Sequence, residues 1–138
     1  MVNEELLKET LERLEQIRPK FDRTEENFGL VDTELRFLRN TLAHAPQVAT
    51  KDISIKTQKD AGFYLFVRNC IERFLQLDWG NMHQEDLESN DECLFSGERI
   101  LASYEHPVDE SMKIWIIADA FLDTGFRQAV TIMFPDDY

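Results

Sequence analysis

The residues whose types and spacing best suit phosphodiester chemistry lie in the segment Arg39-Asn40-Thr41-Leu42-Ala43-His44. An arginine guanidinium can bind a phosphate through two parallel hydrogen bonds. A histidine titrates near neutrality, so it can donate or accept a proton during the reaction. Arg39 and His44 are therefore candidate catalytic residues.

This segment resembles the Arg-Asn-x-x-x-His motif of the HEPN ribonucleases, which are helical, usually dimeric toxins and defence nucleases. The resemblance implies that Arg39 stabilises the phosphate and that His44 acts as general acid or base on the attack of a 2′-hydroxyl. HEPN folds are four-helix bundles, whereas here strands are expected soon after the motif. The alternative is structural: Leu42 lies in the core, Arg39 is solvated, and His44 complements a helix C-terminus.

The second chemical feature is an excess of carboxylates towards the C-terminus. The chain has 27 Asp and Glu against 15 Lys and Arg, a formal net charge of −12. Residues 78–138 contain fourteen acidic and three basic side chains, a balance of −11, whereas residues 51–77 have a balance of +2. Such a field repels nucleic acid and attracts basic protein surfaces.

The acidic face therefore predicts a basic partner protein and no direct contact with nucleic acid. The predicted partner-binding residues are a run of carboxylates and two more in the tail: Glu85, Asp86, Glu88, Asp91, Glu92, Asp136 and Asp137. The alternative is that the acidity serves solubility alone.

Metal and cofactor chemistry finds little support. His83 and His106 lie near acidic residues, but no His-x3-His or Cys-x2-Cys spacing accompanies them. The five glycines are scattered and form no phosphate-binding loop. We therefore expect no metal, no cofactor, and surface structural roles for both histidines.

Composition predicts a compact, cytoplasmic protein that does not enter a membrane. No run approaches the roughly 18 apolar residues of a membrane span, and no secretory leader is visible. Cys70 and Cys93 are expected to be free buried thiols in a reducing compartment, and the alternative is a disulfide between them.

Two amphipathic helices are expected in residues 1–50, as a helical hairpin arm. The first has apolar residues spaced three and four apart and ends at Pro19. The second begins near Thr24 or Asp32, carries a longer apolar stripe and ends at Pro46. Two such helices joined by a short link form an antiparallel hairpin, which could also dimerise.

Two further helices are expected in residues 51–138. Before them, residues 52–55 are a candidate edge strand. A helix from about Gln58 to Leu77 has a broad apolar face, as expected of a helix that covers a sheet. A short acidic helix, about Gln84–Ser96, ends at Gly97, a residue suited to the position after a helix.

The last third of the chain predicts a sheet. Three segments within residues 97–135 are rich in β-branched and aromatic residues and are separated by short turn-forming clusters. Ile114–Ala118 is apolar on both faces, which suits a middle strand. The expected fold class is α+β: an N-terminal helical hairpin (1–50), then two further helices and a three-stranded antiparallel sheet (51–138).

A longer resemblance covers about residues 63–138. Its residues are Phe66-Val67, Cys70, Asp78-Trp79-Gly80, Glu85-Asp86, Asn90-Asp91, Gly97-Glu98-Arg99-Ile100-Leu101, Tyr104, Lys113-Ile114-Trp115-Ile116-Ile117 and Thr131–Tyr138. They are similar to a group of small proteins carried on bacterial plasmids, phages and integrated elements. The chain departs from that group at residues 118–126, where its loop is longer, and at Asp137, which replaces a Glu.

This resemblance implies a mobile element under attack by host nucleases. Small acidic proteins in that setting include anti-CRISPR and anti-restriction inhibitors, whose carboxylates stand in for phosphates. The predicted function is therefore inhibition of a basic, nucleic-acid-binding host protein such as a CRISPR or restriction nuclease. The alternatives are a HEPN-like ribonuclease toxin that uses Arg39 and His44, and a dimeric helical scaffold or antitoxin.

Overall fold

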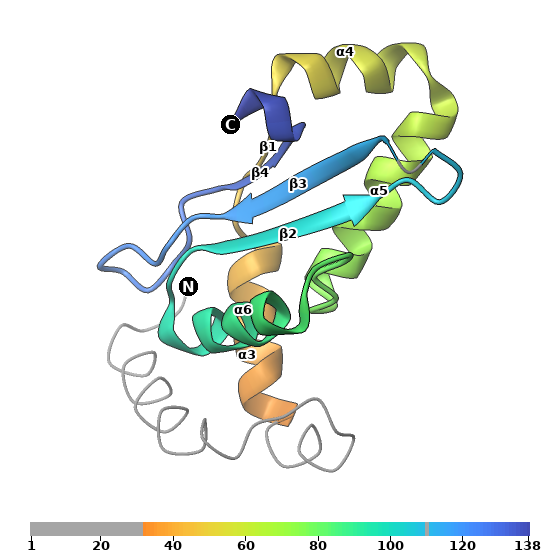
Figure 1. The fold of residues 1–138 in the computed structure, drawn as a ribbon. Coiled ribbons are helices and arrows are strands. Elements are labelled where there is room, and N and C mark those ends of the chain that lie inside the picture. The colour runs from red at the N-terminus through yellow and green to blue at the C-terminus, as the bar shows by residue number, and fades with distance from the viewer. Residues whose placement is uncertain (1–31, 110) are drawn as a thin grey trace.

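The computed structural model describes residues 32–109 and 111–138, and these form an α+β fold (Figure 1). Its elements are α3 (Asp32–Ala43), β1 (Gln47–Ala49), α4 (Lys51–Lys59), α5 (Ala61–Leu75), α6 (Gln84–Ser96), β2 (Ile100–Glu105), β3 (Lys113–Ala118), β4 (Val130–Met133) and the 3₁₀ turn η2 (Pro135–Asp137). The expected α+β class is confirmed. The first helix of the expected hairpin, and with it the hairpin contact, lies outside the described residues.

The second expected helix is present as α3. Three residues of its apolar stripe, Leu38, Leu42 and Ala45, are buried in one core with α5 and the sheet. Pro46 follows the helix, and its carbonyl accepts a hydrogen bond from the backbone N–H of Val130 in β4 (2.9 Å). Residues 32–49 therefore share a core with the segments that follow them.

The expected edge strand at residues 52–55 is wrong, because those residues lie in α4. Ile53 and Ile55 alternate with polar residues as in a strand. Only Ile53 is buried, and a helix can bury that one side chain while Ile55 stays exposed. Asp52 in the first turn and Lys56 in the last turn also favour a helix through its dipole. The strand lies instead at β1, three exposed residues whose sequence carries no strand pattern.

The helix expected from Gln58 to Leu77 is divided at Asp60. Asp60 has extended backbone angles, ends α4 through its N–H, and begins α5 by accepting a hydrogen bond from the N–H of Phe63 at 3.0 Å. This is the side-chain capping that aspartate provides at a helix start. The apolar face of α5 is buried as expected, and its members are Phe63, Phe66, Val67, Cys70 and Phe74.

The sheet has four strands in the order β1-β4-β3-β2. The expected antiparallel meander of β2, β3 and β4 is confirmed, and β3 is an interior strand. The expectation of only three strands is corrected by β1, which pairs with β4 in parallel.

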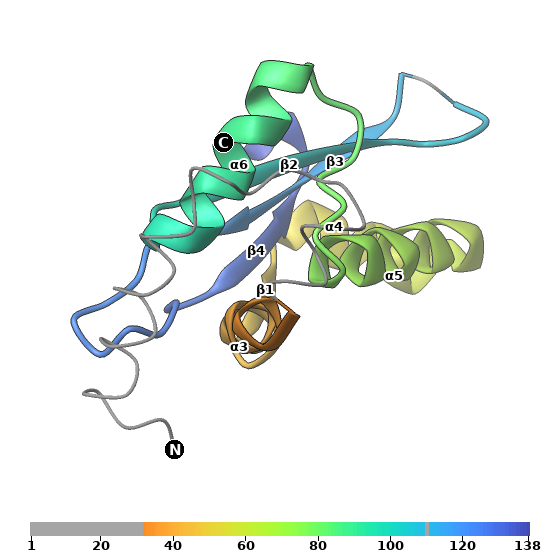
Figure 2. The ribbon, with the colours of Figure 1, turned by 90° about the horizontal axis from the view of Figure 1, so that it is seen from below.

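The two faces of the sheet differ. Figure 2 shows α3 and α5 on one side, and α6 with the C-terminal end of the chain on the other. The α3/α5 side is the core: the strand residues that point there are Ile100, Ala102, Tyr104, Ile114, Ile116, Ala118, Val130 and Ile132, all buried. The residues that alternate with these face the side of α6, and most of them are partly exposed. Among the described residues, no helix is long and apolar enough to cross a membrane.

Candidate functional site

Helix α6 carries most of the predicted acidic run on its surface. Its thirteen residues include five carboxylates and no basic residue. Glu85, Asp86, Glu88 and Glu92 are exposed, and the first two lie in the first turn, where the helix dipole favours negative charge. Gly97, in the left-handed conformation, ends the helix as the sequence predicts.

Asp91 lies apart from this acidic surface. It is 9% exposed, and its Oδ1 accepts a hydrogen bond from Nε1 of the buried Trp79 at 2.9 Å. An indole N–H in a core needs such an acceptor, because an unpaired buried donor is costly. Asp91 therefore fixes α6 to the core, and the exposed acidic set of α6 has four members rather than the predicted five.

The two tail carboxylates also differ from each other. Oδ2 of Asp137 accepts hydrogen bonds from Oγ1 of Thr50 (2.7 Å) and from the N–H of Phe134 (3.1 Å). Asp137 thus anchors η2 beside the start of α4. Asp136 is exposed and lines a groove that Asp86 also lines.

This groove, about 640 Å³ in volume, lies over β2 and β3 on the side of α6. Leu101, Ser103 and Trp115 line it from the strands. Asp86 lines it from α6 and Asp136 from η2, so folding brings together two carboxylates that are 50 positions apart in the chain. The remaining lining residues are Asn81, Met82, His83, Ser111, Met112, Lys113, Phe134 and Pro135. We call the exposed carboxylates of α6 together with this groove the acidic groove face.

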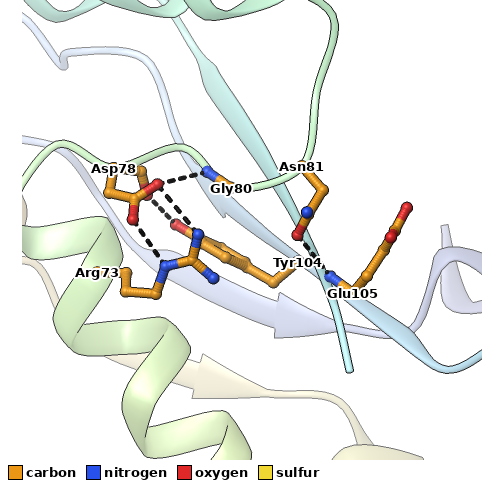
Figure 3. Close-up of polar contacts among 6 residues, drawn as sticks. All are labelled: Arg73, Asp78, Gly80, Asn81, Tyr104 and Glu105. Atoms are coloured by element: carbon orange, nitrogen blue, oxygen red, sulfur yellow. Dashed lines mark hydrogen bonds and ion pairs between the residues drawn. The ribbon is translucent and has the colours of Figure 1, made fainter. Parts of the chain in front are cut away.

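The backbone beside the groove is held by a hydrogen-bonded turn at residues 78–80 (Figure 3). Asp78 accepts from Nε of Arg73 (2.7 Å) and from the N–H of Gly80 (3.0 Å), and its carbonyl accepts from Oη of Tyr104 (2.7 Å). The Asp78 carboxylate raises the pKa of Arg73 through this hydrogen bond. Burial raises the pKa of Tyr104, so its hydroxyl stays a neutral donor.

Glycine is the one residue type that position 80 of this turn accepts. Its φ is +86°, and a Cβ added there would lie 2.1 Å from the carbonyl oxygen of Ser103. The close approach lets residues 79–81 pair with β2: the N–H of Ser103 donates to the carbonyl of Trp79, and the N–H of Asn81 donates to the carbonyl of Ser103. Glycine is required where two backbones come this close.

Two asparagine side chains extend this pairing along β2. Oδ1 of Asn81 accepts from the N–H of Glu105 (3.0 Å), and Nδ2 of Asn90 donates to the carbonyl of Leu101 (2.7 Å). An open strand edge invites pairing with other chains, and these contacts occupy it. The Asp-Trp-Gly and Asn-Asp segments of the sequence resemblance are thus structural in this protein.

Arg127 is a structural residue that sequence reasoning missed. It is 2% exposed, and its guanidinium donates to the carbonyls of Glu98 (2.8 Å), Asp119 (2.9 Å) and Cys93 (3.3 Å). Burial lowers its pKa to about 10, which still leaves it charged at neutral pH. Arg127 thereby ties the end of α6 to the loop after β3. A lone arginine before a strand gives no signal of this role.

The remaining sequence candidates are not gathered at the groove, apart from His83. Arg39 is half-buried in α3, with Leu42 buried one turn later, and His44 is exposed just past the end of the helix. Nδ1 of His106 accepts from the N–H groups of Val108 and Asp109 and so shapes the β2–β3 turn. Within residues 32–109 and 111–138, no group of His, Cys, Asp and Glu could hold a metal ion.

Both cysteines are free thiols within the described structure. Burial raises the pKa of Cys70 to about 12 and raises that of Cys93. A thiol with a raised pKa is a poor nucleophile at neutral pH, so neither residue resembles a catalytic cysteine.

Comparison of the chain with protein families, curated proteins and solved structures gives no match.

Proposed function

We propose that this protein binds and inhibits a basic, nucleic-acid-binding host protein, such as a CRISPR or restriction nuclease, through its acidic groove face. The observation that carries the proposal is α6, a surface helix with four exposed carboxylates and no basic residue. It lies beside a groove lined by one of these carboxylates, Asp86, and by Asp136 of η2. Carboxylates at this density resemble the charge of a phosphate backbone. They would occupy a nucleic-acid channel by direct charge complementarity.

Several features of the described residues support a protein partner rather than a nucleic acid. The net charge of residues 78–138 is −11, which disfavours approach to phosphates. The β2 edge beside the groove is closed by Gly80, Asn81 and Asn90, so a partner at this edge would bind to side chains rather than add a strand. About 800 Å² per partner is enough for a specific complex.

The test begins with affinity capture. Tagged full-length protein is incubated with a nuclease-treated lysate of bacteria that carry a defence nuclease, and the retained protein is then purified. We expect one basic nucleic-acid-binding protein that is released near 1 M salt, where charges are screened within about 3 Å. Its nucleic-acid cleavage should fall when the acidic protein is added.

A matched pair of variants then tests the face. Glu85→Gln/Glu88→Gln/Glu92→Gln removes three charges from α6, and Asp52→Asn/Glu72→Gln/Asp123→Asn removes three exposed charges elsewhere. The α6 variant should weaken binding by about tenfold or more, and the control by about threefold or less, because close charge pairs contribute more than distant ones. Equal losses would mean that only overall charge matters, and would contradict the proposal.

A ribonuclease is the second candidate, and one observation favours it. Nε of Arg39 is buried without a hydrogen-bond partner among the described residues, and an unpaired buried donor sometimes marks a functional residue. Arg39→Ala and His44→Ala should then each abolish RNA cleavage or toxicity on overexpression. A wild-type protein that leaves RNA intact and cells unharmed would exclude this function.

A further inference from the structure

The groove of the acidic groove face has an aromatic floor. Trp115 is half-buried, and in the register of the sheet it lies between Ser103 of β2 and Met133 of β4. Leu101 and Phe134 line the groove beside it. A volume of about 640 Å³ lies within the range of about 300–1,000 Å³ typical of ligand sites. The floor can therefore take a flat or apolar group.

Within the part of the chain that the structure describes, the carboxylates at the rim of the groove have no partners. Among residues 32–109 and 111–138, the side chains of Asp86 and Asp136 make no hydrogen bond or ion pair. Asp60, Asp91 and Asp137, by contrast, each accept at least one hydrogen bond. The rim carboxylates are thus the acceptors that the fold leaves for another molecule.

The other charged and titratable groups at the groove are Lys113 and His83. Lys113 lies at the start of β3, and its cross-strand neighbour on the same face is Glu105, which offsets its charge. His83 precedes α6 and makes no capping hydrogen bond. The carboxylates of Asp86 and Asp136 outnumber the lysine, and the other exposed carboxylates of α6 lie beside them, so the groove favours a cation.

The same face already holds one guanidinium on an aromatic ring. The guanidinium of Arg99 lies 5.2 Å from the ring centroid of Tyr138, and its Nη2 donates to the Tyr138 hydroxyl at 2.8 Å. The rings of Tyr138 and Trp115 are 5.8 Å apart in an edge-to-face arrangement. Trp115 offers the next aromatic surface along this row.

From these observations we infer that the groove binds an arginine side chain of the partner protein, with its guanidinium on Trp115 and between Asp86 and Asp136. Arginine suits it better than lysine, because the planar guanidinium stacks on an indole and also donates two hydrogen bonds to a carboxylate. The exposed carboxylates of α6 beside the groove can pair with further basic residues of the partner segment that carries this arginine. This inference rests on the proposed function and names what the partner inserts.

The test uses the two tryptophan indole N–H signals of the ¹⁵N-labelled full chain. Trp79 is buried and bonded to Asp91, so its signal is an internal reference, and Trp115 reports on the groove. The probes are capped Gly-Arg-Gly, Gly-Lys-Gly and Gly-citrulline-Gly peptides. The arginine peptide should shift the Trp115 signal at a several-fold lower concentration than the lysine peptide. The citrulline peptide, which has the same shape without the charge, should leave it in place.

The carboxylates are tested by Asp86→Asn/Asp136→Asn against the control Asp52→Asn/Asp123→Asn. All four side chains are exposed, so both variants should fold. Loss of the rim pair should weaken binding of the arginine peptide by about twofold to thirtyfold, the range expected when two exposed ion pairs are lost. The control should bind as the wild type does. Equal shifts by the arginine and citrulline peptides, or unchanged binding to the rim variant, would overturn the inference.

The two proposals can fail separately. If the captured partner needs the α6 carboxylates but the arginine peptide leaves Trp115 unchanged, the inhibitor function stands and the arginine site is wrong. If the arginine peptide shifts Trp115 but no basic protein is captured, the site stands and the inhibitor function is wrong.

Discussion

The carboxylates around α6 and β2 have two different roles. Asp78 and Asp91 accept hydrogen bonds from a guanidinium, a backbone N–H and an indole, and they hold the turn at residues 78–80 and α6 in place. Asp86 and Asp136 line the groove, and no described residue donates a hydrogen bond to either side chain. Asp86 and Asp91 lie on the same short helix, five positions apart. The difference separates carboxylates that hold the fold together from carboxylates that stay available to another molecule, and the proposed function uses the second group.

The largest effect on this comparison is expected from a substitution in the turn at residues 78–80, which the structural carboxylate Asp78 holds in place. Gly80→Ala places a Cβ 2.1 Å from the Ser103 carbonyl oxygen in a residue with φ of +86°. We expect a loss of about 3 kcal/mol or more in the free energy of unfolding, measured by urea titration. Gly62→Ala is the control: its nearest contact is Oδ1 of Asp60 at 3.4 Å, and in a helix the change should be neutral or stabilising by up to about 1 kcal/mol. Similar losses in both variants would contradict the close-approach argument.

The next effect compares two positions on α6. Asp91→Ala leaves Nε1 of Trp79 without this acceptor in the core, which should cost about 1–3 kcal/mol of stability. Asp86→Ala removes an exposed side chain and should change stability by about 0.5 kcal/mol or less. Urea unfolding of both variants measures the difference. If the two substitutions cost the same, Asp91 does not have the structural role given to it here.

The hydroxyl of Tyr104 gives a pH-dependent test of the same structural side. Burial raises its pKa in the folded state above the usual value of about 10. Below that value the hydroxyl is neutral in both states. Above it the unfolded chain loses the proton first, so stability falls as pH rises. Tyr104→Phe should lower stability by about 1 kcal/mol at neutral pH, because the bond to the Asp78 carbonyl is lost.

The second part of the prediction concerns how steeply stability falls with pH in alkaline solution. Between about pH 10 and pH 11.5, Tyr104→Phe should lose stability less steeply than the wild type, since one shifted group contributes up to about 1.4 kcal/mol per pH unit. Tyr64→Phe is the matched control, because Tyr64 is 49% exposed. Parallel curves for Tyr104→Phe and the wild type would show that burial does not shift Tyr104.

The smallest expected effect on stability lies at the groove. Asp86→Asn/Asp136→Asn removes two exposed charges from a chain of net charge −12 and breaks no hydrogen bond within the described residues. Unfolding free energy should stay within about 0.5 kcal/mol of the wild type, while binding of the arginine peptide weakens. A large loss of stability would place these carboxylates with Asp78 and Asp91 as structural residues.

Much of the fold could be read from local patterns. The apolar rhythm of α5, the acidic helix that ends at Gly97 and the three strands of the meander each depend on periodicity or on one capping residue. The segments for which the sequence predicts the wrong element are those whose local pattern fits both a helix and a strand, or fits neither. Residues 52–55 alternate as a strand does, yet they form α4, and β1 is a strand only because β4 pairs with it.

The candidate site was less accessible to sequence reasoning. The excess of acid on residues 84–92 was visible, but not that Asp91 turns inward to Trp79 or that Asp137 bonds to Thr50. The groove itself was missed, since Leu101, Trp115 and Asp136 come from separate segments. Arg127 carried no signal, because its three carbonyl partners belong to the backbone and are the same for every sequence.

The sequence by itself determined the α+β class, the periodic elements and the sign of the charge on the last third of the chain, because these follow from residue type and near-neighbour spacing. Only the tertiary structure decided which carboxylates are structural. Burial and hydrogen-bond partners depend on contacts between residues 12 to 87 positions apart, such as Trp79 with Asp91 and Thr50 with Asp137. Contacts of the same kind, from Gly80, Asn81 and Asn90 to β2, occupy one edge of the sheet, and the groove lies beside that edge.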